Sequence, residues 1–317
     1  MEKYKHINLI VSSSPHIMDE ASTSRIMVCV IAGLLPSFGA AVLVFGARPI
    51  FLTLVCILAC IAFEYLFNKI MKKDSTLEDF SAAVTGTLLA FNLPVNMPYW
   101  QAIIGCFVAI IIVKQLFGGI GQNFVNPAIT ARIVLLISFA TPMTTWPTAE
   151  RIFVAADAVT GATPLGLFSQ GDLDALPSNI DMFVGTIGGS MGETSAVAIL
   201  MGGLFLIYKR IITPAIPVSF LGTMIIFSLL VGVDPLFQIL AGGAMLGAFF
   251  MATDYGTSPI TTSGKIVFGI GCGALTMIIR LYGSYPEGVS FAILLMNIVT
   301  PHIDNLSRRR LYGGGEK

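Results

Sequence analysis

A short polar segment at residues 157–165 (DAVTGATPL) carries hydroxyl and carboxylate side chains within a chain that is otherwise almost continuously apolar. Thr163 is its candidate reactive residue, because a threonine hydroxyl can be esterified by a phosphate and the preceding Gly161 and Ala162 leave the backbone open to a bulky donor. Pro164 biases Thr163 toward an extended backbone, and we expect this to project the side chain away from any helix. Considered alone, however, such a segment is usually an ordinary turn.

The composition of the chain indicates a membrane protein. Of its 317 residues, 55% are hydrophobic and only 11% are charged, and the mean hydropathy is +0.83. Because a helix that spans a bilayer needs about 20 largely apolar residues, we expect an all-α polytopic membrane protein. The ten candidate spans are 26–46, 50–68, 80–97, 99–117, 127–146, 186–208, 211–231, 235–253, 264–282 and 288–303.

The distribution of positive charge predicts the orientation in the inner (cytoplasmic) membrane. With ten spans and a cytoplasmic amino terminus, all but three of the 18 Lys and Arg residues fall on the cytoplasmic side, in agreement with the positive-inside rule. The exceptions are Arg48, Arg151 and Arg280. We therefore expect both termini in the cytoplasm and the loop 147–185 outside it. This loop is net negative and offers no patch for nucleic acid.

A weak internal echo predicts two inverted five-helix repeats. Residues 88–91 (LLAF) resemble 246–249 (LGAF), and 103–106 (IIGC) resemble 268–272 (FGIGC). Since each half has an odd number of spans, the second half must cross the membrane in the opposite sense, as in many transport proteins. The expected domains are a cytoplasmic tail 1–24, a first half 25–146, an extracytoplasmic loop 147–185, a second half 186–303 and a cytoplasmic tail 304–317.

Two interrupted segments, 91–98 (FNLPVNMP) and 252–262 (ATDYGTSPITT), lie at matching places in the two halves. Lipid cannot satisfy the backbone groups that such segments expose, so we expect them to meet near the midplane and line a cavity. The candidate lining residues are Asn92, Asn96, Asp254 and Tyr255. The competing interpretation is that these prolines and asparagines merely end helices at the membrane surface.

Other ionisable and thiol side chains in the spans indicate no further site. Glu64 lies one turn from Asn68 and Lys69 at the inner end of its span, so we expect its carboxylate to reach the interface. The five cysteines all fall within spans and form no CxxC pair, which makes a disulfide framework unexpected. Cys56 and Cys60 are helical neighbours, but two thiols fall short of the four ligands of a usual structural metal site. We expect no bound metal.

The pattern D-x-x-[ST]-G-A-T, formed by Asp157, Thr160, Gly161, Ala162 and Thr163, resembles the recognition motif of flavin transferases, which attach FMN through its phosphate to the last threonine. The surrounding chain resembles the D-type membrane subunits of Rnf ion-translocating ferredoxin:NAD oxidoreductases (the NqrB/RnfD family), almost from end to end. The segments that carry this likeness are SSSPH (12–16), LLAFNLPVNMP (88–98), KQLFGGIGQNFVNPA (114–128), DAVTGATPL (157–165), ATDYGTSPIT (252–261) and YPEGVSFAILLMN (285–297).

The resemblance implies a membrane subunit of a redox-driven ion pump with a urea-channel-like fold. FMN on Thr163 would relay electrons at the outer face, between ferredoxin and NAD, and this relay would be coupled to the movement of Na⁺ or H⁺. The resemblance also implies a second, non-covalent flavin such as riboflavin within the membrane. The implied partners are subunits of the A, B, C, E and G types, a flavin transferase for maturation, and membrane lipid.

Two other functions are compatible with the pattern of spans. Inverted repeats with interrupted helices are common in solute channels and secondary transporters, which would need no flavin. A structural membrane anchor for other redox subunits is the second alternative, and Thr163 would then have no chemical role. Covalently bound flavin would separate the redox function from both.

Overall fold

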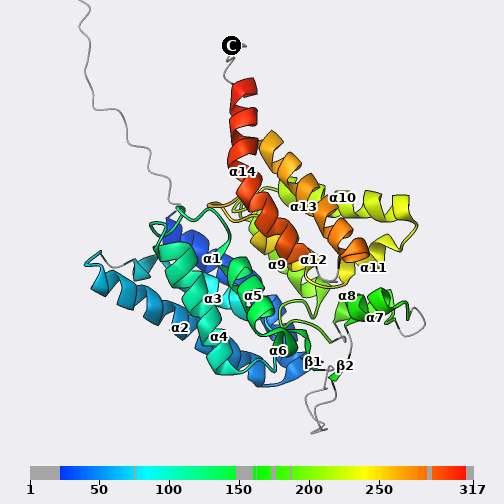
Figure 1. Ribbon diagram of the computed structural model, residues 1–317, viewed down its shortest axis with the longest axis horizontal. Coiled ribbons are helices and arrows are strands. Elements are labelled where there is room, and N and C mark those ends of the chain that lie inside the picture. Colours follow the sequence, from blue (N-terminus) through cyan, green and yellow to red (C-terminus); the bar gives the residue numbers. More distant parts are fainter. Residues whose placement is uncertain are drawn as a thin grey trace, which may run out of the picture.

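The described part of the chain in the computed structural model is helical, with one very short pair of strands (Figure 1). The structure describes residues 22–74, 76–147, 160–161, 163–172, 176–185, 188–283 and 288–311. The tail ahead of residue 22, residues 148–159 of the predicted loop, and two residues of the threonine motif, Asp157 and Ala162, lie outside the described residues.

The amino-terminal part of the chain forms one group of helices (Figure 1). They are α1 (Thr23–Phe45), α2 (Arg48–Ile70), α3 (Ser81–Phe91), α4 (Tyr99–Phe107) with a π-helical continuation (Val108–Gln115), α5 (Pro127–Ser138) and α6 (Ala140–Thr144). A single 3₁₀ turn, Leu77–Asp79, precedes α3.

The rest of the chain forms a second group of helices. After two short helices, α7 (Pro164–Gln170) and α8 (Asn179–Val184), come α9 (Ala196–Tyr208), α10 (Ala215–Val231), α11 (Pro235–Leu240), α12 (Ala244–Leu246) with a π-helical continuation (Gly247–Met251), α13 (Thr262–Tyr282) and α14 (Val289–Leu311). The strands β1 (Trp146–Pro147) and β2 (Thr160–Gly161) pair in antiparallel fashion.

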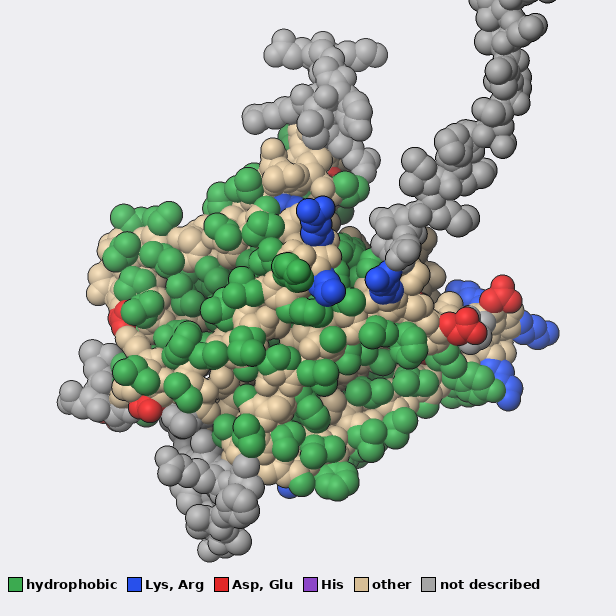
Figure 2. Space-filling view, turned by 180° about the vertical axis from the view of Figure 1, so that it is seen from behind, with side chains coloured by type: hydrophobic (Ala, Val, Ile, Leu, Met, Phe, Trp, Pro, Cys, Tyr) green, Lys and Arg blue, Asp and Glu red, His purple; other side chains and the backbone are tan. Residues whose placement is uncertain are grey.

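The surface and the helix lengths are those of a multi-pass membrane protein. Four helical stretches are long and apolar enough to cross a bilayer: Thr23–Phe45, Arg48–Ile70, Thr262–Tyr282 and Val289–Ser307. On α2, large apolar side chains such as Phe51 and Leu58 are more than half exposed. Figure 2 shows apolar side chains over most of one face of the molecule. Such a continuous apolar surface would aggregate in water but is stable in lipid.

Helical structure occurs at all ten of the expected positions, but several of these segments are interrupted. The third expected span ends at Phe91, where Pro94 and Pro98 prevent the helix from continuing. The fifth is split at Phe139 into α5 and α6, and the eighth is split at Gly242 and Gly243 into α11 and α12. In the sixth, α9 begins only at Ala196, behind a non-helical stretch.

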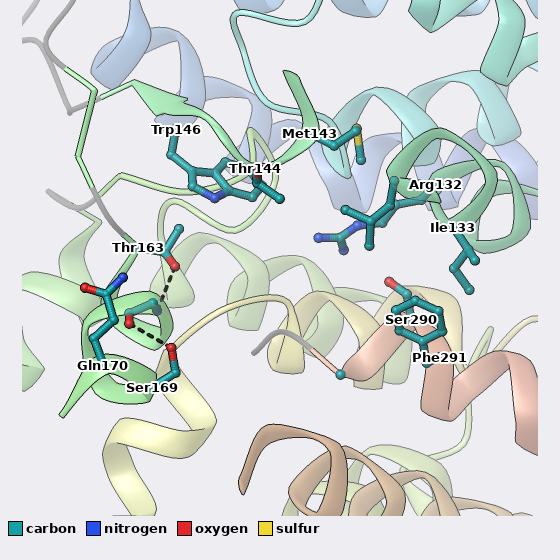
Figure 3. A pocket seen from close by; sticks show the side chains of 13 residues that line it. Arg132, Ile133, Met143, Thr144, Trp146, Thr163, Ser169, Gln170, Ser290 and Phe291 are labelled. Atoms are coloured by element: carbon teal, nitrogen blue, oxygen red, sulfur yellow. Dashed lines mark hydrogen bonds between the residues drawn. The ribbon is translucent and has the colours of Figure 1, made fainter. Parts of the chain in front are cut away.

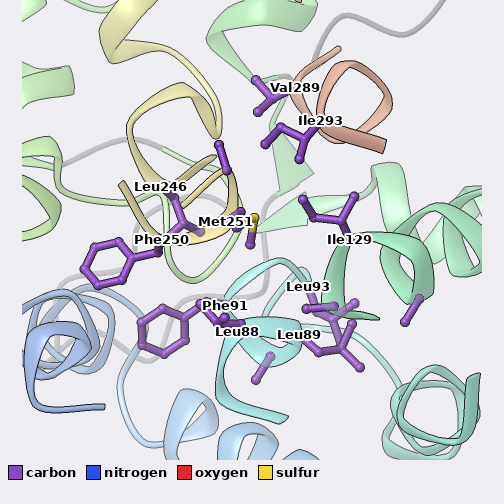
Figure 4. Close-up of a cluster of buried hydrophobic side chains, with 14 of the residues drawn as sticks. Leu88, Leu89, Phe91, Leu93, Ile129, Leu246, Phe250, Met251, Val289 and Ile293 are labelled. Carbon is purple, nitrogen blue, oxygen red and sulfur yellow. The ribbon is translucent and has the colours of Figure 1, made fainter. Parts of the chain in front are cut away.

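The two groups of helices meet along a close helix crossing and a shared core. Helix α1 packs against α9, and α5 packs against α14. Where α1 crosses α9, Gly33 and Gly202 face each other, and a side chain at either position would press on the opposite backbone. Small residues let membrane helices approach closely in this way. The core beside this crossing contains side chains from both groups, including Leu89, Phe91, Ile129, Leu246, Phe250 and Ile293 (Figure 4).

Candidate functional site

Thr163 is the amino-terminal cap of helix α7. Its backbone is extended, with φ −67° and ψ 159°, as expected for the residue before Pro164. Its hydroxyl oxygen accepts a hydrogen bond from the backbone N–H of Gly166 at 3.0 Å. The expectation that the side chain would point away from any helix was therefore wrong, because the extended backbone places the hydroxyl over the first turn of α7.

Two residues of the motif, Thr160 and Gly161, run beside Trp146 and Pro147. In the β1–β2 pair, Gly161 lies opposite Trp146 and Thr160 lies opposite Pro147. The short ladder therefore attaches the motif to the segment that follows α6.

A cavity of about 250 Å³ opens beside Thr163 (Figure 3). Its walls come from three parts of the chain: α5, α6 and β1 on one side, the cap and first turns of α7 on another, and the start of α14 on the third. The side chains that matter most for its chemistry are Arg132, Met143, Trp146, Thr163, Ser290 and Phe291.

The lining of this cavity suits a flat, mostly apolar ligand that carries some negative charge. Trp146 and Phe291 supply aromatic surface, and Met143 is buried beside them. Among the described residues that line the cavity, only Arg132 is charged. Figure 3 shows the guanidinium of Arg132 directed toward the space between Thr163 and Ser290. Pockets for cofactors are commonly apolar with a few precisely placed polar groups of this kind.

Arg132 is held by groups from two other parts of the chain. Its Nη1 atom donates to the side-chain oxygen of Asn92 at 3.0 Å, and it lies 3.4 Å from a carboxylate oxygen of Glu193. All three residues are buried, with relative exposures of 3% for Arg132, 1% for Asn92 and 7% for Glu193. The network therefore joins α5, the end of α3 and the segment before α9 in one buried cluster.

The segment before α9 also covers the first interrupted segment through backbone hydrogen bonds. The N–H of Met191 donates to the carbonyl of Leu93 at 3.2 Å, and the N–H of Gly192 donates to the carbonyl of Phe91 at 2.8 Å. The hydroxyl of Ser37 on α1 donates in turn to the carbonyl of Gly192. Protein groups therefore satisfy backbone carbonyls at the broken end of α3.

Arginines satisfy further carbonyls next to helix breaks. Arg48, at the start of α2, donates to the carbonyls of Val95 and Asn96. Arg280, near the end of α13, donates to the carbonyls of Gln238 and Ala241. Both arginines are among the three exceptions to the positive-inside count, and each is hydrogen-bonded to a helix break in its own half.

The four residues expected to line a membrane cavity occupy different places. Asp254 and Tyr255 line a second cavity of about 190 Å³, together with Ser81, Lys114 and Asn126. Asn92 is buried against Arg132, and its side-chain amide is 3.7 Å from the sulfur of Met251. Asn96 is half-buried, and its carbonyl accepts from Arg48. The two interrupted segments thus approach each other through Asn92 and Met251, one residue before the second segment.

The lining of the second cavity includes two charged residues, Lys114 and Asp254. The Asp254 carboxylate accepts a hydrogen bond from the Thr257 hydroxyl at 3.0 Å. The hydroxyl of Tyr255 donates to the carbonyl of Ile211. Asn126 caps α5 and also donates from its amide to the carbonyl of Met251. Asn126 was not among the residues expected to line a cavity, although an Asn-Pro pair at the start of a helix is a recognisable cap signal.

Glu64 is fully buried, so the expectation that it reaches the membrane interface was wrong. Its carboxylate pairs with Lys114 at 3.0 Å and accepts hydrogen bonds from Gln115 at 2.8 Å and Thr76 at 2.7 Å. Lys114 also donates to the hydroxyl of Ser81 at 2.6 Å. The π-helical continuation of α4 positions Lys114 and Gln115 toward α2. A buried charge is stable when it is paired in this way.

All five cysteines are free, as expected. Cys56, Cys60 and Cys106 are buried, and Cys106 donates to the carbonyl of Cys56. Within the described part of the chain, no group of three or more His, Cys, Asp or Glu side chains could hold a metal ion.

Comparisons with known proteins show relatives that match nearly the whole chain. The D-type subunit of the Na⁺-translocating ferredoxin:NAD⁺ oxidoreductase complex of Acetobacterium woodii is 52% identical over 312 residues, which cover 97% of this chain and 96% of that protein. The corresponding subunit of the proton-translocating complex of Clostridium ljungdahlii is 42% identical, with 96% of each chain covered. That of an ion-translocating oxidoreductase complex of Stutzerimonas stutzeri is 41% identical, with 93% and 94% covered.

A family model matches over a similar range. It covers residues 10–313 and describes the NQR2, RnfD, RnfE family. The match includes both groups of helices and the segment between them that holds Thr163. The chain therefore belongs to the NQR2, RnfD, RnfE family.

Proposed function

We propose that this chain is the D-type membrane subunit of a redox-driven ion pump that connects ferredoxin with NAD⁺ and moves Na⁺ or H⁺ across the inner membrane. The names of the relatives support the redox reaction, and they include both a Na⁺-translocating and a proton-translocating complex. In this proposal the subunit completes no catalytic cycle alone. It works with subunits of the A, B, C, E and G types and is surrounded by lipid.

FMN attached to the hydroxyl oxygen of Thr163 is the proposed electron carrier of this subunit. The observation that carries the proposal is that Thr163 lines a cavity with Trp146, Phe291 and Arg132. Aromatic and apolar side chains suit a flavin ring, and a guanidinium suits the negative charge of a flavin or its phosphate. At about 250 Å³ the cavity is small for a complete cofactor. The ring would fill it, and the phosphate would remain at the cap of α7.

A flavin transferase is proposed to recognise the motif that ends at Thr163. Asp157, Thr160, Gly161 and Ala162 are its other members. Gly161 pairs with Trp146, which lines the cavity together with Thr163, and this supports attachment at this place. A covalent bond keeps the carrier there at a high effective concentration, whatever the concentration of free flavin.

A second, non-covalent flavin such as riboflavin is proposed for the cavity that Asp254 and Tyr255 line. Helix α5 supports this placement, because Ala128 lines the second cavity and Arg132 lines the first. Four residues of α-helix rise by about 6 Å, so the two cavities approach each other along α5. A short separation of this kind is what a relay of single electrons requires.

We also propose that the chain crosses the membrane ten times, as two inverted five-helix repeats. The packing of the helices supports the repeat, because α2 contacts α3 and α4 in the first group as α10 contacts α11 and α13 in the second. In this arrangement both termini are cytoplasmic and Thr163 lies at the outer face. The orientation was predicted by counting Lys and Arg residues on each side of the membrane, with Arg132 on the cytoplasmic side. Arg132 does not support that count, because it is buried beside the Thr163 cavity rather than in a cytoplasmic loop.

Labelling with a membrane-impermeant maleimide tests the orientation. Ile180 on α8 and Lys209 at the end of α9 are both exposed, whereas the native cysteines are buried or half-buried. In intact cells, the variant Ile180→Cys should be labelled and Lys209→Cys should react only after permeabilisation. The reverse pattern would contradict the proposed orientation and place Thr163 in the cytoplasm.

Covalent flavin on Thr163 is tested in the complex purified from a host that has a flavin transferase. The denatured wild-type subunit should fluoresce on a gel, and the peptide that contains residues 157–165 should carry the mass of FMN. Thr163→Val should abolish both signals. Thr144→Val is the matched control, because Thr144 lines the same cavity but lies outside the motif. A wild-type subunit without flavin would overturn the redox function and favour a channel or an anchor.

A further inference from the structure

Arg132 touches both the cavity beside Thr163 and the carboxylate of Glu193. From this geometry we infer that the Arg132–Glu193 pair couples charge in the cavity to cation binding at Glu193. The negative charge of an electron that arrives in the cavity attracts the Arg132 guanidinium. The guanidinium then neutralises the Glu193 carboxylate less, and Glu193 binds a cation more strongly. The inference rests on the proposed function, because it requires an electron acceptor in the cavity.

The position of Arg132 is unusual for a positive charge in a membrane protein. Its exposure is 3%, and the guanidinium lies at the contact between the two groups of helices, between Asn92 and Glu193. Charges in such surroundings interact more strongly than in water, because little solvent screens them. A change of one unit of charge in the cavity therefore alters the energy of the Arg132–Glu193 pair directly.

The Arg132 guanidinium has a second, neutral acceptor beside Glu193. The Arg132 Nη1 atom lies 3.4 Å from the Glu193 carboxylate, compared with 3.0 Å in the other buried pair, Glu64 with Lys114. Asn92, a neutral acceptor, lies closer to the same Nη1 atom, at 3.0 Å. The guanidinium is thus shared among acceptors, and a further negative group in the cavity would compete with Glu193 for it.

The carboxylate of Glu193 also lies against the break between α11 and α12. Gly243 is so close to a carboxylate oxygen of Glu193 that a side chain at position 243 would displace it. On the far side of this break, Arg280 donates to the carbonyl of Ala241 and lies next to Gly242. Arg132 therefore contacts the Glu193 carboxylate directly, and Arg280 lies beside the neighbouring residue of the same break.

The charges balance with one cation for each electron. One electron from the donor within the complex adds one negative charge to the cavity, and one Na⁺ or H⁺ bound to the Glu193 carboxylate adds one positive charge. When the cation is H⁺, an O–H bond forms at Glu193, and no other covalent bond changes. Coupling between two binding events is reciprocal. Cation binding must therefore raise the midpoint potential of the covalent flavin as much as reduction raises the affinity for the cation.

The experiment measures the midpoint potential of the covalent flavin in the purified complex. The Thr163→Val complex, which lacks this flavin, serves as the blank from which its signal is identified. Potentials are measured against Na⁺ concentration at constant pH, and then against pH without Na⁺. For one cation per electron, each tenfold rise in the coupled cation should raise the potential by about 59 mV.

Glu193→Gln should remove the dependence on the coupled cation. Glu64→Gln is the matched control, since it also breaks a buried ion pair but lies outside the lining of the Thr163 cavity; its dependence should equal that of the wild type. Reduced flavins take up protons themselves, so the pH series is judged by the difference between the wild type and Glu193→Gln. If both have the same slopes in both series, the inference is overturned.

A second variant keeps the test decisive if Glu193→Gln does not assemble. Glu193→Asp retains the carboxylate but withdraws it from Arg132, and its dependence should move to higher cation concentration by tenfold or more. An unchanged curve would overturn the inference. The absence of flavin from the wild-type Thr163 peptide would instead refute the proposed function, so the two failures are distinguishable.

Discussion

Gly202 on α9 lies directly against the backbone carbonyl of Gly33 on α1, with no room for a side chain between them. This contact joins the first group of helices to the second. It also determines how closely the cores of the two groups can approach, because any atom added here pushes the helices apart.

Gly202→Ala should destabilise the protein, because its new methyl group would overlap the carbonyl of Gly33. Overpacking of this kind costs about 1–3 kcal/mol, and thermal unfolding of the purified complex would show it as a lower midpoint. Gly39→Ala is the control on α1, since a side chain there meets no atom within 4 Å. Equal unfolding midpoints for the two variants would contradict the close crossing.

Lys114→Met should be strongly destabilising, because it leaves the Glu64 carboxylate buried without its cation. Breaking one partner of a buried pair costs about 3–5 kcal/mol. The double variant Lys114→Met with Glu64→Leu should recover much of this loss, since no unpaired charge remains. Denaturant unfolding in detergent measures both free energies. A double variant less stable than Lys114→Met would contradict this account.

Arg280→Leu should destabilise the protein more than Arg48→Leu. Both arginines donate to carbonyls at a helix break, but Arg280 is 4% exposed whereas Arg48 is exposed. Water can replace Arg48, whereas the carbonyls of Gln238 and Ala241 would lose a buried donor at a cost of about 1–3 kcal/mol each. Unfolding midpoints of the two variants test the order, and the opposite order would count against it.

Thr163→Ala should loosen the first turn of α7, whereas Thr163→Ser should retain it. The hydroxyl accepts from the N–H of Gly166 at 3.0 Å, and loss of such a cap costs about 1 kcal/mol. Hydrogen exchange of the Gly166 amide, measured by mass spectrometry on unflavinylated protein, should accelerate several-fold in Thr163→Ala only. Equal exchange rates in both variants would show that the cap has no effect.

Local patterns were sufficient to predict where the long apolar helices lie and where the two interrupted segments, 91–98 and 252–262, fall. Apolar runs indicated the positions of all ten helical segments, and Pro94 and Pro98 indicated where α3 ends. The break between α11 and α12 was not expected, because Gly242 and Gly243 are tolerated inside many membrane helices. The structure gives the reason for these glycines, because the side chains of Glu193 and Arg280 lie against them and leave little room for a larger residue.

Contacts between distant residues account for what the sequence did not predict. Glu64 and Lys114 are separated by 50 residues, and Arg132 and Glu193 by 61. Neither separation has a periodicity that could have paired them. Charge counting assigned Lys114 and Arg132 to the cytoplasmic side, yet both are 3% exposed and paired with carboxylates. Thr163 was identified by its neighbours in the sequence, but its cavity required Trp146 and Phe291 from elsewhere.

The walls of the cavity beside Thr163 come from both groups of helices. One wall is formed by α5, α6 and β1, another by α7, and the third by the beginning of α14. If one group of helices rocks against the other, the walls separate or close, and whatever occupies the space is squeezed or released. A ligand attached to Thr163 would therefore respond to relative movement of the two groups of helices, because it contacts residues of both groups.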